Sequence, residues 1–253
     1  MSRQSAFLLP GTGNGPHVDG TVSFDRRLAT ALTWPFGIAL TSWHYMWRTT
    51  PMHRTEVEGD RGDLPPPLRA GFRREGLQLP SDGVGPLFHR RYEARIREPR
   101  LTAEALIDLL GRDPNRASPT EFARFRKVGR REGERLQPND ELLVHMPGPW
   151  NGPVRVAEVT PTSFRYATLD GHLEAGQIEF AAADRDGGLW FRIESWARSG
   201  DRLSNLLFAH LRMAKEVQLH MWSSLLERVA EVAGGRLAGG IEIETRRLDE
   251  PDA

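Results

Sequence analysis

The chain has no cysteine among its 253 residues. Disulfide bonds, thiolate metal sites and a cysteine nucleophile are therefore excluded. Charge of one sign is not in excess either, because 34 basic and 34 acidic residues cancel. No overall field then points to nucleic acid, membrane lipid or an acidic partner. Lysine is nearly absent, and the dominance of arginine indicates a GC-rich bacterial genome rather than a function.

Motifs of the common catalytic and cofactor-binding classes are missing as well. The sequence holds no P-loop, no G-x-S-x-G and no H-E-x-x-H, and no strand precedes the GTGNG of residues 11–15. His172 and Glu174 have the H-x-E spacing of zinc deaminases, but those enzymes also need a P-C-x-x-C partner. The basic run at residues 124–135 has little aromatic interleaving and is predicted to be a solvated strand and turn. We therefore expect no metal, no cofactor and no nucleic acid.

Composition divides the chain into five parts. Residues 1–22 are rich in Gly, Pro, Ser and Thr, and residues 56–86 are rich in Pro, Gly and charge, so both are typical of loose connections. The part between them, residues 23–55, has a mostly helical pattern. A compact domain is predicted over residues 87–235, followed by a polar tail at 236–253.

The predicted domain has the order of one strand, two helices, several strands and one long helix. Thr102 is expected to cap the helix at 101–112, and Ser118 with Glu121 forms a capping box for a helix at 118–125. Gly234-Gly235 ends the last helix, 202–233. Strands are predicted at 87–96, 140–146, 153–159, 163–169, 177–183 and 189–197.

The stretch FRYATLDGHLEAGQIEF, residues 164–180, is predicted to be a hairpin with a long loop. A two-residue turn after Asp170 would give poor burial of the apolar residues. A seven-residue loop, 170–176, places apolar partners on one face, which is a strong discriminator because a one-residue slip exchanges the faces. The predicted pairs are Tyr166 with Phe180, Phe164 with Ala182 and Thr168 with Ile178.

The neighbouring strands are predicted to extend this sheet. A turn at Asp186-Gly187 sets Phe180 opposite Ile193 and Ala182 opposite Phe191. On the other face Glu158 lies across from Arg165, while Glu179 lies diagonally between Arg165 and Arg192. Such cross-strand charge pairs stabilise a sheet, so we interpret Glu179 as structural.

His172 and Glu174 lie in the loop and are not committed to the sheet. His172 could cap the loop or bond to a neighbouring carbonyl, and this is the reading we favour. The alternative is a ligand contact or a proton-transfer role for the pair.

The long helix carries an apolar stripe that is expected to lie against the apolar face of the sheet. Its members are Leu203, Leu207, His210, Ala214, Val217, Met221, Leu225 and Val232, with Arg228 near its end. A second line, Phe208, Leu219, Trp222 and Leu226, occupies the opposite side of the helix. This line would need cover from the N-terminal segment or from another subunit, which leaves a homodimer open.

The run from Phe164 to Arg198, followed by a long helix, resembles an uncharacterised family known as a domain of unknown function. The hallmark of that family is Y-G-T-L-P-G-H-P-E-x-G-E-E-x-F. Here it is matched by Tyr166, Thr168, Leu169, Gly171, His172, Glu174, Gly176 and Phe180, with Glu179 fitting loosely, whereas Ala167, Asp170, Leu173 and Gln177 depart from it.

The resemblance covers roughly residues 87–235 and carries implications for the fold. The family is similar to the START/Bet v 1-like (SRPBCC) superfamily, so the resemblance implies an α+β helix-grip fold, a curved antiparallel sheet wrapped around a long C-terminal helix. It implies a cavity between sheet and helix, and no reaction.

The N-terminal residues 28–47 contain no Asp, Glu, Lys or Arg and are long enough to cross a membrane. Trp43, Tyr45 and Trp47 gather at one end as at a membrane interface, but Pro35 and several polar residues dilute the apolar character. Packing on the protein's own domain, contact with a membrane surface, and a membrane span all stay open. The start of the chain has no pattern of a secretory leader, so we expect a cytoplasmic protein, or one peripheral at the membrane.

The function predicted from these patterns is non-catalytic binding of a hydrophobic or amphipathic, lipid-like small molecule between sheet and helix. An enzyme of the same fold using His172 and Glu174, and a membrane-associated interaction protein, are the alternatives. The predicted ligand contacts are Tyr166, Phe180, Ile193, His210, Ala214 and Arg228.

Overall fold

The computed structural model describes residues 50–119, 123–129, 131, 133–146, 151–200 and 213–249, without the side chains of residues 151 and 213–217. The expectations for residues 1–49, including 28–47, and for His210 lie outside these residues. The first part of the predicted helix at 202–233 does so as well.

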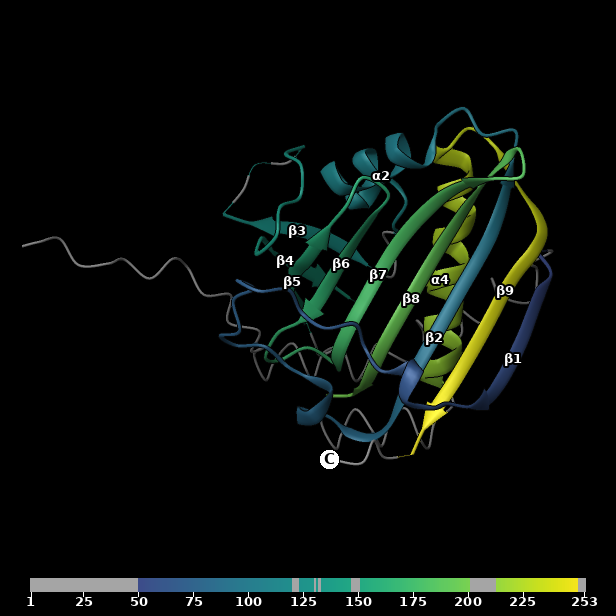
Figure 1. The fold of residues 1–253 in the computed structure, drawn as a ribbon. Helices are drawn as coiled ribbons and strands as arrows, with labels where there is room; N and C mark the ends of the chain where they lie inside the picture. Colours follow the sequence, from purple (N-terminus) through teal and green to yellow (C-terminus); the bar gives the residue numbers. More distant parts are fainter. Residues whose placement is uncertain are drawn as a thin grey trace, which may run out of the picture.

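Within the described residues the chain forms one nine-stranded sheet with two longer helices (Figure 1). The strands are β1 Met52–Glu58, β2 Val84–Arg97, β3 Arg124–Val128, β4 Glu141–His145, β5 Asn151–Val159, β6 Ser163–Thr168, β7 Glu174–Arg185, β8 Gly188–Ser199 and β9 Arg236–Leu248. The helices are α2 Ala103–Arg112 and α4 Met213–Val232, with short 3-10 turns η1 Arg61–Asp63, η2 Pro80–Asp82 and η3 Pro114–Arg116.

The strand order in the sheet is β1-β9-β2-β8-β7-β6-β5-β4-β3. All neighbours are antiparallel except β1 and β9, which are parallel. The sheet curves around α4, and α2 lies over one end of β6 and β7 (Figure 1). One strand, a helical segment, an antiparallel run of strands and a long helix held by the sheet make this a helix-grip fold, as predicted.

We call the face of the sheet that contacts α2 and α4 the inner face, and the opposite face the outer face. Alternation along β2 sends Tyr92, Ala94 and Ile96 to the inner face, where all three are buried in the main hydrophobic core. Helix α2 adds its apolar side to the same core, and Thr102 caps its first turn as expected. The core is therefore a single layer between the sheet and the two helices.

Helix α4 packs against the sheet through its second apolar line, the one that we expected to face away from the sheet. Trp222 lies with its ring 6.0 Å from that of Phe180 on β7, and Leu226 is fully buried. Of the stripe predicted to face the sheet, Leu225 is buried in the same core, whereas Met221 and Val232 are only partly buried. The prediction was therefore only partly right, because the one indole and two leucines of the other line remove more apolar surface from water. The line through Trp222 thus gives no argument for a second subunit.

The β6–β7 hairpin differs from the predicted register by two residues. Phe164 pairs with Phe180, and Tyr166 pairs with Ile178, so β7 begins at Glu174 and the seven-residue loop was wrong. An even shift leaves the same residues on each face. The Oγ1 of Thr168 accepts a 2.8 Å hydrogen bond from the backbone N–H of Gly176, which fixes the shorter connection.

Other registers are as predicted. Phe180 pairs with Ile193 and Ala182 with Phe191 across β7 and β8, and Glu158 pairs with Arg165 across β5 and β6. Glu179 lies directly opposite Arg165 rather than diagonally, and its ion pair is with Arg192 at 3.3 Å.

Three segments differ from their predicted structure. Residues 236–248 of the expected polar tail form β9, whose Ile241 and Ile243 alternate into the core. Strand β1 spans residues 52–58, across the predicted boundary between the helical segment and the connector. Of the helix predicted at 118–125, Arg124 and Phe125 belong to β3 instead. In the first two cases pairing with a neighbouring strand supplies backbone hydrogen bonds that short polar segments cannot provide for themselves.

Residues 59–83 of the predicted loose connector lie across the outer face of the sheet. Phe72 packs there against Ala157 of β5 and Ala167 of β6 in a second, smaller hydrophobic cluster. Arg155, buried on β5, donates from Nη1 to the carbonyls of Arg73 and Glu75 at 2.8 Å each. We call residues 59–83 the outer-face segment, because these contacts fasten it to the sheet.

Candidate functional site

A cluster of aromatic rings occupies the inner face of the sheet opposite α4. Its members are Phe125 of β3, Phe164 and Tyr166 of β6, Phe180 of β7 and Trp222 of α4. Neighbouring centroids lie between 5.2 Å for Phe164 and Phe180 and 6.4 Å for Phe125 and Tyr166. Sheet alternation brings the four strand residues to one face, and α4 lays Trp222 over them. Ile193 of β8, also buried, pairs with Phe180 at the edge of the cluster.

Two hydrogen-bond donors in this aromatic cluster have no partner among the described residues. They are the Oη of Tyr166 and the Nε1 of Trp222, in residues that are 2% and 8% exposed. Burial raises the pKa of Tyr166 far above its usual range, so its hydroxyl stays protonated. A buried donor without a partner costs about 1–3 kcal/mol, so these two groups call for an acceptor atom within the apolar layer.

The structure brings together some of the predicted ligand contacts and separates others. Tyr166, Phe180 and Ile193 share the inner face. Arg228 instead donates from Nη1 to the carbonyl of Ser118 at 3.4 Å, where it ties α4 to the chain after η3. Ala214 lies on α4, but its side chain is outside the described residues, as is the whole of His210.

His172 caps the loop between β6 and β7. Its Nδ1 accepts a 2.9 Å hydrogen bond from the backbone N–H of Glu174, and its ring lies against the backbone of Gly152. Burial lowers the pKa of His172 to about 4, so the imidazole is neutral at pH 7. The side-chain amide of Gln78 donates to the carbonyls of His172 and Glu174 at 3.0 and 3.2 Å. These contacts show that His172 holds the loop between β6 and β7 in place.

The carboxylate of Glu174 points to the inner face and meets two donors. Its Oε1 accepts a 3.1 Å hydrogen bond from Nε2 of Gln218 on α4 and lies 4.0 Å from Nη1 of Arg90 on β2. Burial raises the pKa of Glu174, and this effect outweighs the neighbouring guanidinium and amide. We call Arg90, Glu174 and Gln218 the polar cluster.

Arg90 and Gln218 were missed at the level of sequence. Arg90 precedes Tyr92 by two residues on β2, so alternation places its side chain on the same face as the core residue. That pattern could have revealed an arginine directed inward. Gln218 carried no such signal, because its role depends on Glu174, a residue 44 positions away.

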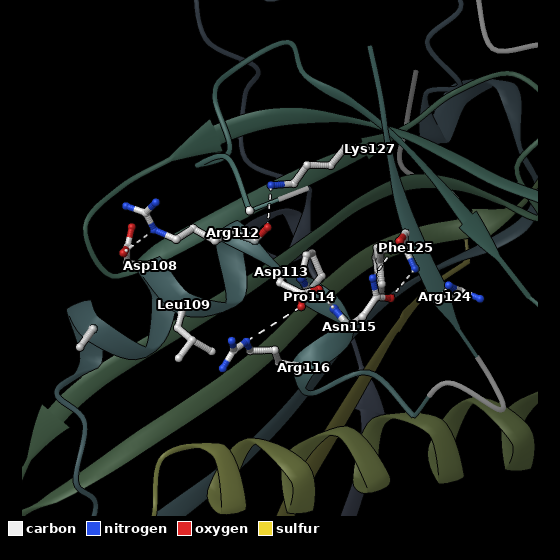
Figure 2. Close-up of a pocket in the computed structure, with 12 residues that line it drawn as sticks. Asp108, Leu109, Arg112, Asp113, Pro114, Asn115, Arg116, Arg124, Phe125 and Lys127 are labelled. Atoms are coloured by element: carbon white, nitrogen blue, oxygen red, sulfur yellow. Dashed lines mark hydrogen bonds and ion pairs between the residues drawn. The ribbon is translucent and has the colours of Figure 1, made fainter. Parts of the chain in front are cut away.

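A separate hollow of about 1030 Å³ lies outside the core, between α2, η3 and β3 (Figure 2). Several of its charged side chains are engaged within the protein. Lys127 donates from Nζ to the carbonyls of Gly111 and Arg112 at the end of α2, and Arg112 bonds Asp108 at 2.9 Å. The first part of the basic run, predicted to be a solvated strand and turn, thus forms β3. Lys127 of this strand binds backbone carbonyls at the C-terminal end of α2.

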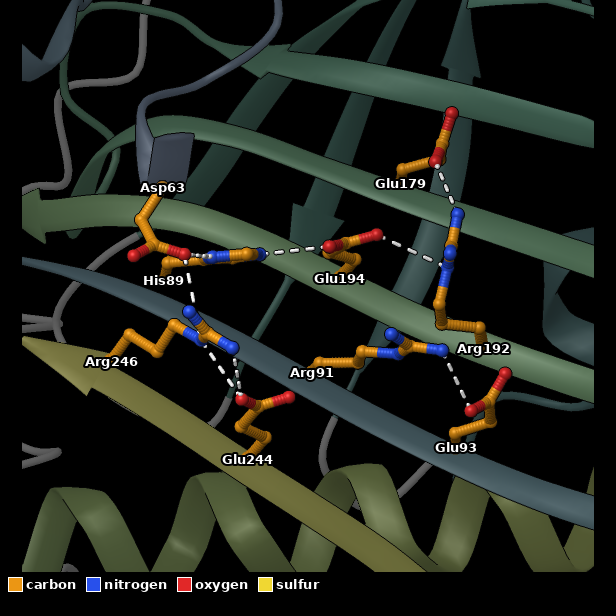
Figure 3. Close-up of polar contacts among 9 residues, drawn as sticks. All are labelled: Asp63, His89, Arg91, Glu93, Glu179, Arg192, Glu194, Glu244 and Arg246. Atoms are coloured by element: carbon orange, nitrogen blue, oxygen red, sulfur yellow. Dashed lines mark hydrogen bonds and ion pairs between the residues drawn. The ribbon is translucent and has the colours of Figure 1, made fainter. Parts of the chain in front are cut away.

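The outer face carries a network of charged residues around His89 (Figure 3). The Nδ1 of His89 lies 2.8 Å from Asp63 and its Nε2 lies 2.8 Å from Glu194, while its ring stacks on Trp196 at 5.2 Å. Burial opposes the charged form of His89, but hydrogen bonds to both carboxylates outweigh it and raise the pKa. Arg192 extends the network from Glu194 to Glu179, as the predicted charge ladder implied.

Neither the inner nor the outer face shows a metal centre in the described part of the chain, where no three His, Asp or Glu side chains gather as ligands. The same residues include no helix long and apolar enough to cross a membrane.

The fold and the inner-face site place the protein in the helix-grip class. Residues 119–228 match the model of a family described as "Domain of unknown function (DUF1990)". This match confirms, over those residues, the resemblance predicted from the motif around His172. No curated protein matches the chain.

Several solved structures are similar to the chain at low identity. A hypothetical protein from Helicobacter pylori has a TM-score of 0.43 and 9% identity, covering 56% of this chain and 86% of its own. A protein from Thermus thermophilus has a TM-score of 0.43 and 12% identity, covering 57% and 96%. A norcoclaurine synthase point mutant from Thalictrum, in complex with a transition-state analogue, has a TM-score of 0.42 and 8% identity, covering 59% and 96%. The strand order and the position of α4 define the fold as helix-grip.

Proposed function

We propose that the protein binds a hydrophobic or amphipathic small molecule between the inner face of the sheet and α4, without catalysing a reaction. The observation that carries this proposal is the pair of buried donors, Tyr166 Oη and Trp222 Nε1, within an otherwise apolar aromatic cluster. Ligand sites of this kind are mostly apolar and hold a few polar groups that fix the orientation of the ligand.

The two donors define the chemistry of the proposed ligand. An apolar molecule that carries an oxygen acceptor, such as a carbonyl or an ether, would satisfy the phenol or the indole N–H. Its apolar body would contact Phe164, Phe180 and Ile193, all of which are buried on the same face. A ligand without an acceptor would leave both donors unpaired, so the cluster favours molecules that carry oxygen.

Binding is better supported than acid/base chemistry by His172 and Glu174. The Nδ1 of His172 is engaged by the backbone of its own loop, and its pKa of about 4 lies well below neutral pH. An efficient general acid or base has a pKa near the working pH. Contact with a membrane surface through residues 28–47, a homodimer and a cytoplasmic location stay predictions.

The proposal is tested by titrating the full-length protein with Nile red, an uncharged apolar dye that carries a carbonyl oxygen. The protein is first extracted with organic solvent, and native mass spectrometry of the extract and of the untreated protein identifies any molecule that copurifies. We expect saturable binding of the dye with enhanced fluorescence. Removing the hydroxyl with Tyr166→Phe should weaken binding by about 5–20-fold, the loss of one hydrogen bond.

A matched pair of tryptophan variants separates the site from general effects. The Nε1 atoms of Trp222 and Trp190 both lack a partner among the described residues, but Trp190 lies on the outer face of β8. Trp222→Phe should weaken dye binding, whereas Trp190→Phe should leave it unchanged. No saturable binding of Nile red, together with no copurifying molecule, would overturn the proposal.

A further inference from the structure

Arg90 is an arginine buried on the inner face of the sheet with few partners. Its side chain is 7% exposed. Its guanidinium carbon lies 4.4 Å from the centre of the Phe88 ring, and its nearest carboxylate oxygen, on Glu174, is 4.0 Å away. Among the described residues it makes no hydrogen bond within 3.5 Å. A buried cation is normally paired and hydrogen-bonded, because removing its hydration shell is expensive.

Gln218 supplies a second donor at the same point. Its side-chain amide donates to Oε1 of Glu174 at 3.1 Å, the same oxygen that faces Arg90. A donor from β2 and a donor from α4 therefore converge on one carboxylate oxygen. The planar guanidinium and a neighbouring amide form a combination that suits a carboxylate, because two parallel N–H bonds can reach its two oxygens.

The polar cluster shares α4, β7 and the inner face with the aromatic cluster that defines the proposed ligand site. Gln218 precedes Trp222 by four residues on α4, which is about one turn, or roughly 6 Å along the helix axis. Glu174 precedes Phe180 by six residues on β7, roughly 20 Å along the strand, and both side chains lie on the inner face. An elongated molecule could thus span from one cluster to the other.

The side chain of Glu174 is less buried than that of Arg90. It is 20% exposed, compared with 7% for Arg90, so of the two side chains it lies closer to solvent. Its backbone is held independently of the carboxylate, by His172 and Gln78. Displacement of the carboxylate would therefore leave the loop between β6 and β7 in place.

We propose that Arg90 and Gln218 bind the carboxylate of an amphipathic ligand, and that the carboxylate of Glu174 occupies the same donors when no ligand acid does. This inference rests on the proposed function and names the class of its ligand, an apolar molecule that ends in a carboxylic acid. A doubly charged phosphate fits less well, because one guanidinium and one amide supply a single positive charge.

The test compares two probes that differ only in the acid group. Dansylaminoundecanoic acid and its methyl ester share an apolar chain and a fluorescent dansyl group, and only the free acid carries a negative charge. We expect the wild-type full-length protein to bind the acid at least about 10-fold more tightly than the ester, the value of one charge-assisted hydrogen bond or more.

Variants assign this preference to the polar cluster. Arg90→Met should abolish the preference for the acid while binding of the ester persists. Glu174→Gln removes the competing carboxylate and should tighten binding of the acid several-fold with little effect on the ester. Arg91→Met is the matched control, because Arg91 lies on the opposite face of β2, where it pairs with Glu93 at 2.8 Å. If Arg90→Met does not fold, Gln218→Met, at a half-buried position, is expected to reduce the preference in the same direction.

The outcomes distinguish this inference from the proposed function. Equal affinity for acid and ester in the wild-type protein, or an unchanged preference in both Arg90→Met and Gln218→Met, would overturn the carboxylate site. Saturable binding of Nile red without binding of the acid would do the same and would leave the proposed function standing. Failure of Nile red and of both dansyl probes to bind overturns the two together.

Discussion

His89 and Asp63 join β2 to the outer-face segment, with Nδ1 of the imidazole 2.8 Å from Oδ1 of the carboxylate. The other ring nitrogen lies 2.8 Å from Glu194 on β8. The imidazole therefore lies between two carboxylates from different parts of the chain (Figure 3). Hydrogen bonds outweigh the effect of burial on all three groups, raising the pKa of His89 and lowering the pKa values of Asp63 and Glu194. The outer-face segment is thus held most firmly while the histidine is charged and both acids are ionised.

The stability contributed by His89 should decrease as the pH rises above neutral. A raised pKa means that the folded protein holds the proton more tightly than the unfolded chain does. The contribution is therefore complete below pH 6.5, the ordinary value for histidine, and is lost as the pH rises through the pKa of the folded state. Urea unfolding at several pH values between about 5.5 and 9, for the wild-type protein and for His89→Gln, should show the difference between them shrinking with increasing pH. A constant difference would show that folding leaves the pKa of His89 unchanged.

Substitution of Gly176 should destabilise the β7–β8 pair strongly. A Cβ at this position would lie 1.9 Å from the carbonyl oxygen of Trp196, a backbone atom that cannot move without breaking the ladder. We expect Gly176→Ala to reduce the free energy of unfolding by more than about 3 kcal/mol, as severe overpacking does. Gly111→Ala is the control, since its Cβ would meet nothing closer than 3.9 Å in helix α2, where alanine is favoured by about 1 kcal/mol. Equal melting temperatures for the two variants would refute the close approach at Gly176.

Arg155 should contribute more than any other single residue to holding the outer-face segment on the sheet. Its guanidinium donates to two carbonyls of that segment and to Glu141 at 2.7 Å, with a side chain only 2% exposed. Arg155→Met leaves the two carbonyls without this donor and leaves Glu141 with only its 3.2 Å bond from Arg73, so it is expected to cost about 3–5 kcal/mol. Limited proteolysis should then cut within residues 59–83 faster than in the wild-type protein. Arg192→Met, on the more exposed ion pair with Glu179, should cost about 1 kcal/mol or less and leave the cleavage rate unchanged.

Pairing across β7 and β8 could be predicted from the sequence because a tight turn at Asp186-Gly187 leaves one register that buries Phe180 and Ile193 together. The β6–β7 register could not, because a side-chain contact between Thr168 and Gly176 decides it, and apolar matching is nearly as good two residues away. Strand β9 was missed for a related reason. Gly239 and Gly240 interrupt its alternation, and their positive φ values accompany the register shift opposite β2.

The site was predictable only where one strand's own pattern revealed it. Tyr166 and Phe180 belong to a hairpin whose alternation shows their shared face. Trp222 was placed on the far side of α4, because helical periodicity alone does not say which of two apolar stripes meets a sheet. The polar cluster depends on contacts between β2, the start of β7 and α4, and such contacts follow from the topology of the sheet rather than from any local pattern.

The loop histidine should show a pH dependence opposite to that of His89. Burial lowers the pKa of His172 to about 4, so between this value and 6.5 the unfolded chain binds a proton that the folded protein does not. The contribution of His172 is complete above pH 6.5 and is lost as the pH falls, by on the order of 3 kcal/mol near pH 4. His172→Asn keeps a polar group in the loop but does not titrate, and acid unfolding curves for the variant should be shallower than those of the wild-type protein. An acid transition that is unchanged in the variant would place the proton uptake elsewhere.

The Tyr166→Phe variant should be more stable than the wild-type protein when no ligand is bound, and less stable than it when ligand is bound. The Oη of Tyr166 is buried with no partner among the described residues, so its removal relieves a desolvation penalty and should raise the free energy of unfolding by about 1 kcal/mol. A bound ligand stabilises the folded state according to its affinity, and the variant is expected to bind Nile red more weakly. Melting temperatures should therefore rank the variant above the wild-type protein after solvent extraction and below it at saturating dye. A variant that is less stable under both conditions would show that the hydroxyl is already paired within the fold, and would remove the main support for a ligand at the aromatic cluster.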